Sequence, residues 1–386
     1  MTTPLKPKTV YILGAGFSAP AGGPDQSRLL EKIFDLKDPK PKVKNAQKAL
    51  RKFLIETMRI AEDEFKNVQL EDIYTPIDRC IADNIHYRGH AHRSLRRLAE
   101  QLDYLISLAI EESFRDGSNS SEYVNQFAQH LVDHAYIRSQ KAQGDVTADE
   151  AKAYDPFSII SLNWDILLDQ ALYQKLEIKD GYIDGDYEPI GVVDYCCYIS
   201  SIDPNNRRIR TGLWALGSRG YNVKLLKIHG SMNWLQCPNC QQLFVSFNQK
   251  ENIPNYLNPK ECRHCSENDI QSNLRGSMIM PTFLKDLSNF QLKLIWQNTA
   301  VELMEARNLV FIGYSLPQAD FEFRQLISRT IHPNTTVHVV LFKGKNKKAK
   351  LAYEEECDRY RQFFGKRKVT FEPKGVEEYV TKLCNG

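Results

Sequence analysis

Four of the nine cysteines stand in two C-x-x-C pairs whose spacing is typical of a metal site. The pairs are Cys237 with Cys240 and Cys262 with Cys265, separated by 21 residues. Two such pairs supply the four thiolates of a tetrahedral zinc site, at a separation slightly above the common range of roughly 15 to 20 residues. Because four thiolates leave no open coordination position, we expect zinc in a structural role, with four free thiols as the alternative.

A glycine-rich turn follows the first apolar run. The segment VYILGAGFSAPAGGP, residues 10–24, places Gly14-Ala15-Gly16 at the end of that run and continues with small side chains such as Ser18. Glycines here let a ligand approach the backbone, and amides of the turn can bind a pyrophosphate. The pattern differs from G-x-G-x-x-G, so a tight connection between a strand and a helix remains an equal alternative.

Asn163 and Asp165 directly follow a second apolar run, in the segment SLNWD. An asparagine amide can hold a ribose hydroxyl or a nucleophilic water. Asp165 taken alone is better explained as the N-cap of the helix that we expect at 165–175. Asn163 is harder to explain as a cap and is the stronger functional candidate.

Two further runs end in residues that can do chemistry. His229 closes one of them in KIHG, where a side chain that titrates near neutral pH can take a proton from a ribose hydroxyl. A histidine at a strand end is nevertheless more often structural. Gly313 and Ser315 close the other in GYSL, where Ser315 can bind a phosphate or a ribose, or lie in an ordinary turn.

The apolar runs predict the strands that must position these residues. They lie at 9–14, 157–162, 225–230, 308–313 and 335–342, and helical patterns follow at 165–175, 318–330 and 346–362. Buried strands that alternate with helices predict an α/β fold with a doubly wound parallel sheet covered on both faces. In such sheets the ligand lies beyond the carboxyl ends of the strands, where all these segments converge.

The remaining parts of the chain predict two additions to this sheet. Residues 31–154 contain little that resembles a strand and show apolar residues at helical spacing, so we expect a helical insertion there. The cysteine pairs predict a small zinc-ribbon module at about 235–268. Residues 1–30 and 155–386 would then form the nucleotide-binding domain.

Composition excludes several classes of function. The 386 residues are 42% hydrophobic and 26% charged, which is typical of a soluble globular protein. A net charge of +3 argues against direct binding to nucleic acid or to a membrane. The N-terminus lacks the apolar stretch of a signal peptide, and we expect a cytoplasmic protein.

In their order along the chain, these motifs resemble the sirtuin family, and more closely its bacterial defence-associated branch. GAGFSAPAGGPD is similar to the family's opening motif, SLNWD to its T-Q-N-x-D segment, KIHG to the segment of its general-base histidine, and GYSL to G-T-S-L. The cysteine pairs stand where the family carries its zinc ribbon. The resemblance covers residues 10–25 and about 157–320 and implies a Rossmann-like fold that binds NAD.

The resemblance also implies roles by position. Asn163 and His229 would be catalytic, with His229 as the general base. The NAD contacts would come from Gly14, Ala15, Gly16, Ser18, Asp25, Asp165, Gly313 and Ser315. The four paired cysteines would bind zinc.

One departure from the family favours hydrolysis. Protein-deacylating sirtuins have phenylalanine and arginine directly after the P-D pair, whereas Gln26 and Ser27 follow here. Without that phenylalanine the reactive ribose carbon would be open to water, so we expect an NAD glycohydrolase. NAD-dependent lysine deacylation and non-catalytic sensing of NAD or ADP-ribose are the alternatives.

The defence-associated relatives deplete NAD to stop phage multiplication. An activity of that kind harms its own host, so we expect it to be gated. The resemblance implies a homo-oligomer as the gate, or a partner such as a ring-shaped ATPase or an Argonaute-like protein.

Overall fold

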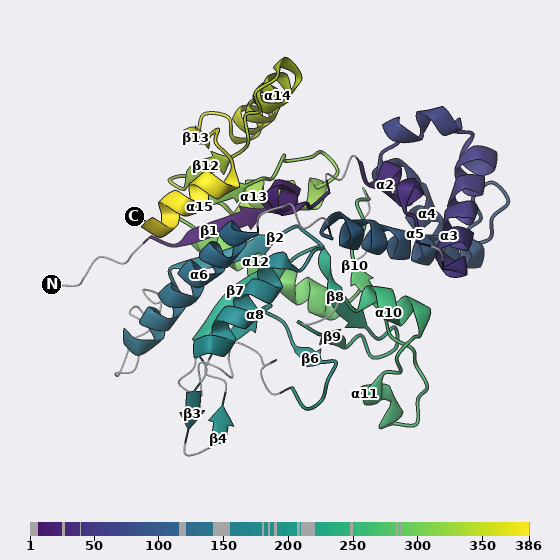
Figure 1. Cartoon of the computed structure of the whole chain (residues 1–386), viewed down its shortest axis with the longest axis horizontal. Coiled ribbons are helices and arrows are strands. Elements are labelled where there is room, and N and C mark those ends of the chain that lie inside the picture. Colours follow the sequence, from purple (N-terminus) through teal and green to yellow (C-terminus); the bar gives the residue numbers. More distant parts are fainter. Residues whose placement is uncertain are drawn as a thin grey trace.

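The computed structural model describes residues 7–24, 28–38, 40–115, 121–141, 155–179, 181–183, 186–188, 191–206, 209, 221–247, 250–282, 285 and 287–385. Its centre is a seven-stranded parallel sheet in the order β13-β12-β11-β1-β2-β7-β5 (Figure 1). The strands are β1 (Thr9–Leu13), β2 (Phe157–Ser161), β5 (Gly191–Asp194), β7 (Tyr221–Lys227), β11 (Asn308–Ile312), β12 (Thr336–Val340) and β13 (Val369–Glu372). The predicted α/β fold with a doubly wound parallel sheet is confirmed.

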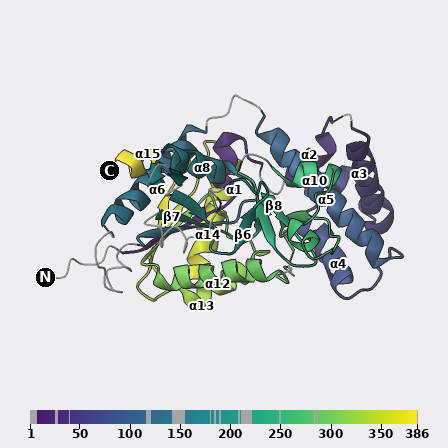
Figure 2. The same ribbon diagram turned by 90° about the horizontal axis from the view of Figure 1, so that it is seen from below.

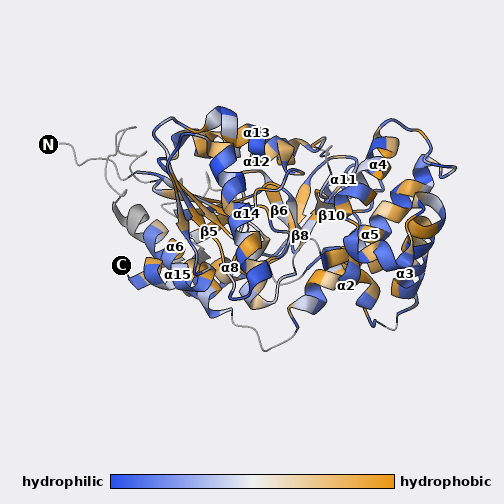
Figure 3. Ribbon diagram, turned by 90° about the horizontal axis from the view of Figure 1, so that it is seen from above, coloured by the Kyte–Doolittle hydropathy of each residue, from blue (hydrophilic) through white to orange (hydrophobic). Residues whose placement is uncertain are grey.

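Helices cover both faces of this sheet, which explains why its central strands are buried and largely apolar. One face carries α6 (Glu122–Lys141), α8 (Leu167–Lys179) and α15 (Val376–Asn385), and the other carries α12 (Phe290–Glu305) and α13 (Phe321–Thr330), as Figure 2 shows. The helix α14 (Lys347–Phe364) packs against β13. All five residues of β2 are buried, and Figure 3 shows the apolar strands inside a shell of more polar helices.

The chain reverses its direction of travel across the sheet at β1. From this central strand it runs through β2 towards β7 and β5, and it later returns on the other side to build β11, β12 and β13. Such a reversal leaves a crevice at the carboxyl ends of the strands, because the connections on its two sides diverge. The carboxyl ends of β1, β2, β7 and β11 meet at this crevice.

A helical unit with a core of its own stands beside the sheet (Figure 1). It consists of α2 (Leu29–Asp35), α3 (Pro41–Lys52), η3 (Phe53–Met58), η4 (Glu62–Asn67), α4 (Leu70–Ala82) and α5 (His92–Ser113). Buried leucines at positions 95, 98, 102 and 105 give α5 the apolar stripe that faces the other helices.

The helix α6 lies within the predicted 31–154 insertion but packs elsewhere. Its buried residues, among them Phe127 and Leu131, belong to the core of the parallel sheet, where α6 contacts α8, β7 and α15. The hydroxyl of Tyr123 also donates a hydrogen bond to the carbonyl of Phe17. In this structure α6 therefore belongs to the core of the parallel sheet, whereas the core of the helical unit also takes in Ile166, Met232, Ile253 and Met280.

A second sheet carries the cysteine pairs. It has the order β10-β8-β9-β6, built from β6 (Ile199–Ser201), β8 (Gly230–Gln236), β9 (Leu243–Val245) and β10 (Arg275–Met278). The short helices α10 (Asn252–Leu257) and α11 (Arg263–Ser266) flank it. The remaining elements are α1 (Ala15–Ser18), η1 (Ala19–Ala21) and the hairpin of β3 (Gly181–Ile183) and β4 (Asp186–Glu188). Among the described residues, no helix has the length and apolar composition needed to span a bilayer.

Candidate functional site

A cavity of about 720 Å³ opens at the crevice of the parallel sheet. That volume lies within the range of ligand pockets, roughly 300 to 1,000 Å³. Residues of the helical unit, including Leu29 and Ile110, complete its wall. The predicted site residues that line it are Gly14, Ala15, Gly16, Ser18, Asn163, Asp165, His229, Gly313 and Ser315. Asp25, Gln26 and Ser27 lie outside the described residues.

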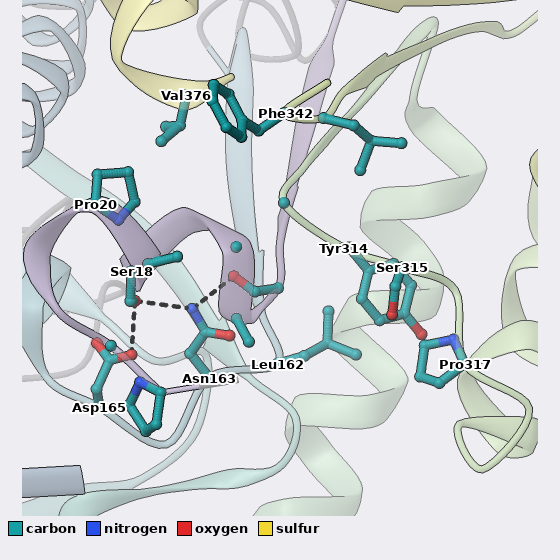
Figure 4. A pocket seen from close by; sticks show the side chains of 18 of the residues that line it. Ser18, Pro20, Leu162, Asn163, Asp165, Tyr314, Ser315, Pro317, Phe342 and Val376 are labelled. Atoms are coloured by element: carbon teal, nitrogen blue, oxygen red, sulfur yellow. Dashed lines mark hydrogen bonds between the residues drawn. The ribbon is translucent and has the colours of Figure 1, made fainter. Parts of the chain in front are cut away.

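Asn163 is held by two hydrogen bonds at the floor of this cavity (Figure 4). Its Nδ2 donates to the carbonyl of Gly14 over 2.9 Å and to Oγ of Ser18 over 3.2 Å. These bonds use the amide nitrogen, and they fix the side chain so that Oδ1 is available to accept a hydrogen bond. Asn163 therefore presents an oriented acceptor to a ligand.

Asp165 fixes the Ser18 hydroxyl that contacts Asn163. Its Oδ2 accepts the hydroxyl hydrogen of Ser18 over 2.7 Å, and its Oδ1 accepts from the amide of Leu167, at the start of α8. Burial raises the pKa of Asp165, against the positive charge of Lys227 and the hydrogen bond from Ser18. Asp165 stands one residue before the N-cap position of α8, which begins at Leu167, yet it still bonds the first amide of that helix, and Ser18 links it to Asn163.

The glycines of the turn after β1 pack against another segment of the chain. A Cβ on Gly14 would lie 2.6 Å from Cα of Tyr314, and a Cβ on Gly16 would lie 2.7 Å from Cα of Gly313. The amides of Gly14 and Gly16 donate to the carbonyls of Ile312 and Gly313. These glycines are required because the turn after β1 packs directly on the turn after β11.

Gly313→Ala is expected to lower the free energy of unfolding by about 2 to 5 kcal/mol, from left-handed strain together with overpacking. Gly313 has a φ of +61°, and a Cβ there would lie 2.2 Å from the carbonyl carbon of Gly16. Urea denaturation measures the change. Gly89→Ala is the control, because Gly89 has a φ of +88° and open space around it, so it should show only the strain of about 1 to 2 kcal/mol. Equal losses in both variants would contradict the packing argument.

His229 lies between β7 and β8 and is 6% exposed. Its Nδ1 lies 3.3 Å from the carbonyl of Leu162, and its Nε2 is buried without a hydrogen-bond partner. Because a carbonyl only accepts, Nδ1 carries the proton of the neutral ring and Nε2 carries the lone pair. Burial, aided by the charge of Lys285, lowers the pKa of His229 to about 4. His229 is therefore neutral at pH 7 and able to act as a base.

Asp320 faces His229, and the sequence analysis did not select it. Its Oδ1 lies 3.5 Å from Nε2 of His229 and 3.3 Å from Nζ of Lys285, and its Oδ2 accepts from the hydroxyl of Tyr314 over 2.9 Å. The sequence offered one signal, an aspartate in GYSLPQAD near the start of the helix predicted at 318–330, which suggests a helix cap. In the structure the Asp320 side chain makes no capping hydrogen bond to α13.

Acidification from pH 7 to pH 5 is expected to weaken the folded state through His229 by about 2 kcal/mol. The unfolded chain binds a proton at His229 below its ordinary pKa of 6.5, whereas the folded chain does so only near 4. The free energy of unfolding due to His229 therefore falls as the pH falls. Asp103 acts in the opposite direction, because burial raises its pKa to about 7. Urea denaturation of wild type and His229→Ala across this range isolates the effect, and parallel pH profiles would contradict it.

The four paired cysteines come together beside the second sheet, from the loop between β8 and β9 and from the start and body of α11. Their sulfur atoms all lie within 4.8 Å of one another, with 3.5 Å between Cys237 and Cys265 and 3.7 Å between Cys240 and Cys262. A tetrahedron of sulfurs around zinc has edges of about 3.8 Å, since Zn–S bonds are about 2.3 Å long. The donor set fits zinc, and none of its members is among the described residues that line the cavity.

Comparisons with known proteins do not identify the function of this site. No protein-family model and no curated protein sequence matches the chain. One matching solved structure is Sir2 in complex with the inhibitor EX-527, 2'-O-acetyl-ADP-ribose and a deacetylated p53 peptide. It is 13% identical over 98% of this chain and 93% of that chain, with a TM-score of 0.34. A likeness this distant carries no weight for function.

Proposed function

We propose that the chain is an NAD glycohydrolase, which converts NAD+ and water to nicotinamide, ADP-ribose and a proton. The observation that carries the proposal is the meeting of Asn163 and a neutral, buried His229 in one cavity at the switch point of the sheet. The sirtuin-like order of the motifs supplies the substrate. We also propose the roles that Asn163 and His229 have in this reaction.

In this reaction the bond between nicotinamide and the ribose breaks, and nicotinamide leaves with the electron pair. Asn163 Oδ1 accepts a hydrogen bond from a ribose hydroxyl or from the attacking water. His229 Nε2 takes the proton, from the water as it attacks or from the hydroxyl.

The diphosphate of NAD requires contacts other than the backbone amides of Gly14 and Gly16. The charged residues that line the cavity, among those described, are Lys374 and the carboxylates of Asp165, Asp320, Glu356 and Glu377. The amides of Gly14 and Gly16 already donate within the protein. Lys374 forms a solvent-exposed ion pair with Glu378 over 2.6 Å, a weak contact that a phosphate can replace. We therefore assign the diphosphate to Lys374 and to polar groups of the turn after β11, such as Ser315.

The proposal includes control of the activity, since unrestrained loss of NAD would harm the cell. Assembly into a homo-oligomer or binding of a partner protein would supply this control, in antiphage defence by NAD depletion. The partner proposed from the resemblance is an ATPase or an Argonaute-like protein.

The test is to incubate the pure protein with NAD, alone and with the product of a neighbouring gene, and to follow nicotinamide and ADP-ribose by chromatography. Equal amounts of the two products support the hydrolase. Nicotinamide release that requires an acyl-lysine peptide would identify a deacylase instead. Binding of NAD without turnover under every condition would identify a sensing module.

A further inference from the structure

Two hydrogen-bond acceptors face each other at the inner end of the cavity. Nε2 of His229 and Oδ1 of Asp320 are 3.5 Å apart, and the two residues are only 6% and 7% exposed. The proton on Nδ1 leaves Nε2 with a lone pair, so neither atom donates to the other while His229 is neutral. Nε2 is therefore a buried acceptor without a donor, which costs free energy and calls for a missing partner. Oδ1 of Asp320 already lies near the ammonium group of Lys285, and a carboxylate oxygen can accept a second hydrogen bond beside it.

The surroundings hold Asp320 as an acceptor in one position. Tyr314 donates to Oδ2, and Lys285, whose side chain is 1% exposed, lies 3.3 Å from Oδ1. A buried ammonium group stabilises the ionised form of a neighbouring carboxyl. Asp320 and Lys285 together are electrically neutral, and the lysine repels any further cation. The missing partner is therefore an uncharged hydrogen-bond donor.

We propose that Asp320 and His229 form a clamp for two neighbouring hydroxyl groups, the cis-diol of a ribose, with one hydroxyl donating to each acceptor. A lone hydroxyl carries one hydrogen and satisfies one acceptor, whereas a diol brings two donors side by side. The inference rests on the proposed function, which supplies the ribose. It makes Asp320 a further substrate-binding residue, with Lys285 and Tyr314 as the residues that position it.

The test compares NAD with analogues that lack either the 2'- or the 3'-hydroxyl of the nicotinamide ribose. The wild type is expected to lose roughly 10- to 150-fold in kcat/KM for the analogue that lacks the hydroxyl facing Asp320, as for a hydrogen bond to a charged group. In Asp320→Asn this discrimination is expected to shrink at least several-fold. The double variant Asp320→Asn/Lys285→Met is expected to show the same reduced discrimination between NAD and the analogue. It leaves no buried lysine without a carboxylate partner.

Asp169→Asn is the matched control. Asp169 is equally buried and accepts from a tyrosine, Tyr195, over 2.7 Å and from a lysine, Lys227, over 3.0 Å, but it is not among the described residues that line the cavity. A loss of stability alone should therefore leave the discrimination of this variant at the wild-type ratio. Unchanged ratios in both Asp320 variants, or equal changes in Asp169→Asn, would overturn the clamp.

The same comparison separates the clamp from the proposed reaction. If the protein binds NAD without cleaving it, calorimetric affinities for NAD and the two analogues replace kcat/KM. If the ratio of these affinities depends on Asp320, the clamp is supported even though the proposed hydrolase activity is wrong. If wild type binds neither NAD nor ADP-ribose, both are overturned.

Discussion

Replacing His229 with alanine is expected to slow nicotinamide release from NAD by roughly 100- to 10,000-fold, the usual contribution of a positioned general base. The reason is geometric: Leu162 fixes the proton on Nδ1, and burial keeps the ring neutral, so the lone pair on Nε2 is present at pH 7. Initial rates of nicotinamide release at pH 7, under the conditions in which wild type is active, measure the change.

The control for this prediction is another histidine with a similarly depressed pKa. Burial and the neighbouring His134 lower the pKa of His130, on α6, to about 4, but His130 is not among the described residues that line the cavity. His130→Ala should release nicotinamide at the wild-type rate. Asn163→Ala should lose activity as His229→Ala does, because its amide is held by Gly14 and Ser18 at the same site. Full activity in His229→Ala would remove the base from the mechanism.

Cys262→Ser is expected to lose its bound metal and to melt about 10 °C or more below wild type, because structural zinc contributes roughly 10 to 16 kcal/mol of binding free energy to folding. The wild type should carry one zinc per chain. The four sulfurs, together with Leu235, Phe244 and Leu274, make up most of the small core around the cluster, so little else replaces the metal there. Metal analysis and thermal unfolding measure the two effects.

Cys357→Ser controls for the burial of a cysteine. Cys262 and Cys357 are both fully buried, but Cys357 belongs to the core of the parallel sheet. This variant should retain one zinc per chain and show a smaller loss of melting temperature. Wild type purified without zinc from a medium that contains it, or Cys262→Ser with a full complement of zinc, would contradict the structural role.

The sequence was most informative where a strand is buried on both faces. Such strands are largely apolar on both faces, so β1, β2, β11 and β12 stand out as short, mostly apolar runs. The edge strands β5 and β13 were missed, since each has only four residues and β13 remains partly exposed. The order of the strands, which no run can reveal, places the polar strand ends at one crevice.

The sequence could not reveal which side chains meet at the site, because these contacts join segments that are far apart along the chain. Glycine at 14 and 16 indicated a close approach to the backbone, and the structure shows that Gly313 and Tyr314 make this approach, while a phosphate at this turn stays a prediction. Asp320 was overlooked because its partners Lys285 and His229 are 35 and 91 residues away along the chain.

The sequence by itself determined the fold class, the residues that end the main strands, and the two cysteine pairs whose sulfurs cluster beside the second sheet. Each of these follows from local rules: apolar runs for buried strands, glycine or polar residues at their ends, and a fixed spacing of cysteines. Only the tertiary structure decided that Asn163 is oriented by Ser18, that His229 is neutral, and that Asp320 faces it. Orientation, burial and electrostatic pairing are set by neighbours in space, and those neighbours come from segments far apart in the chain.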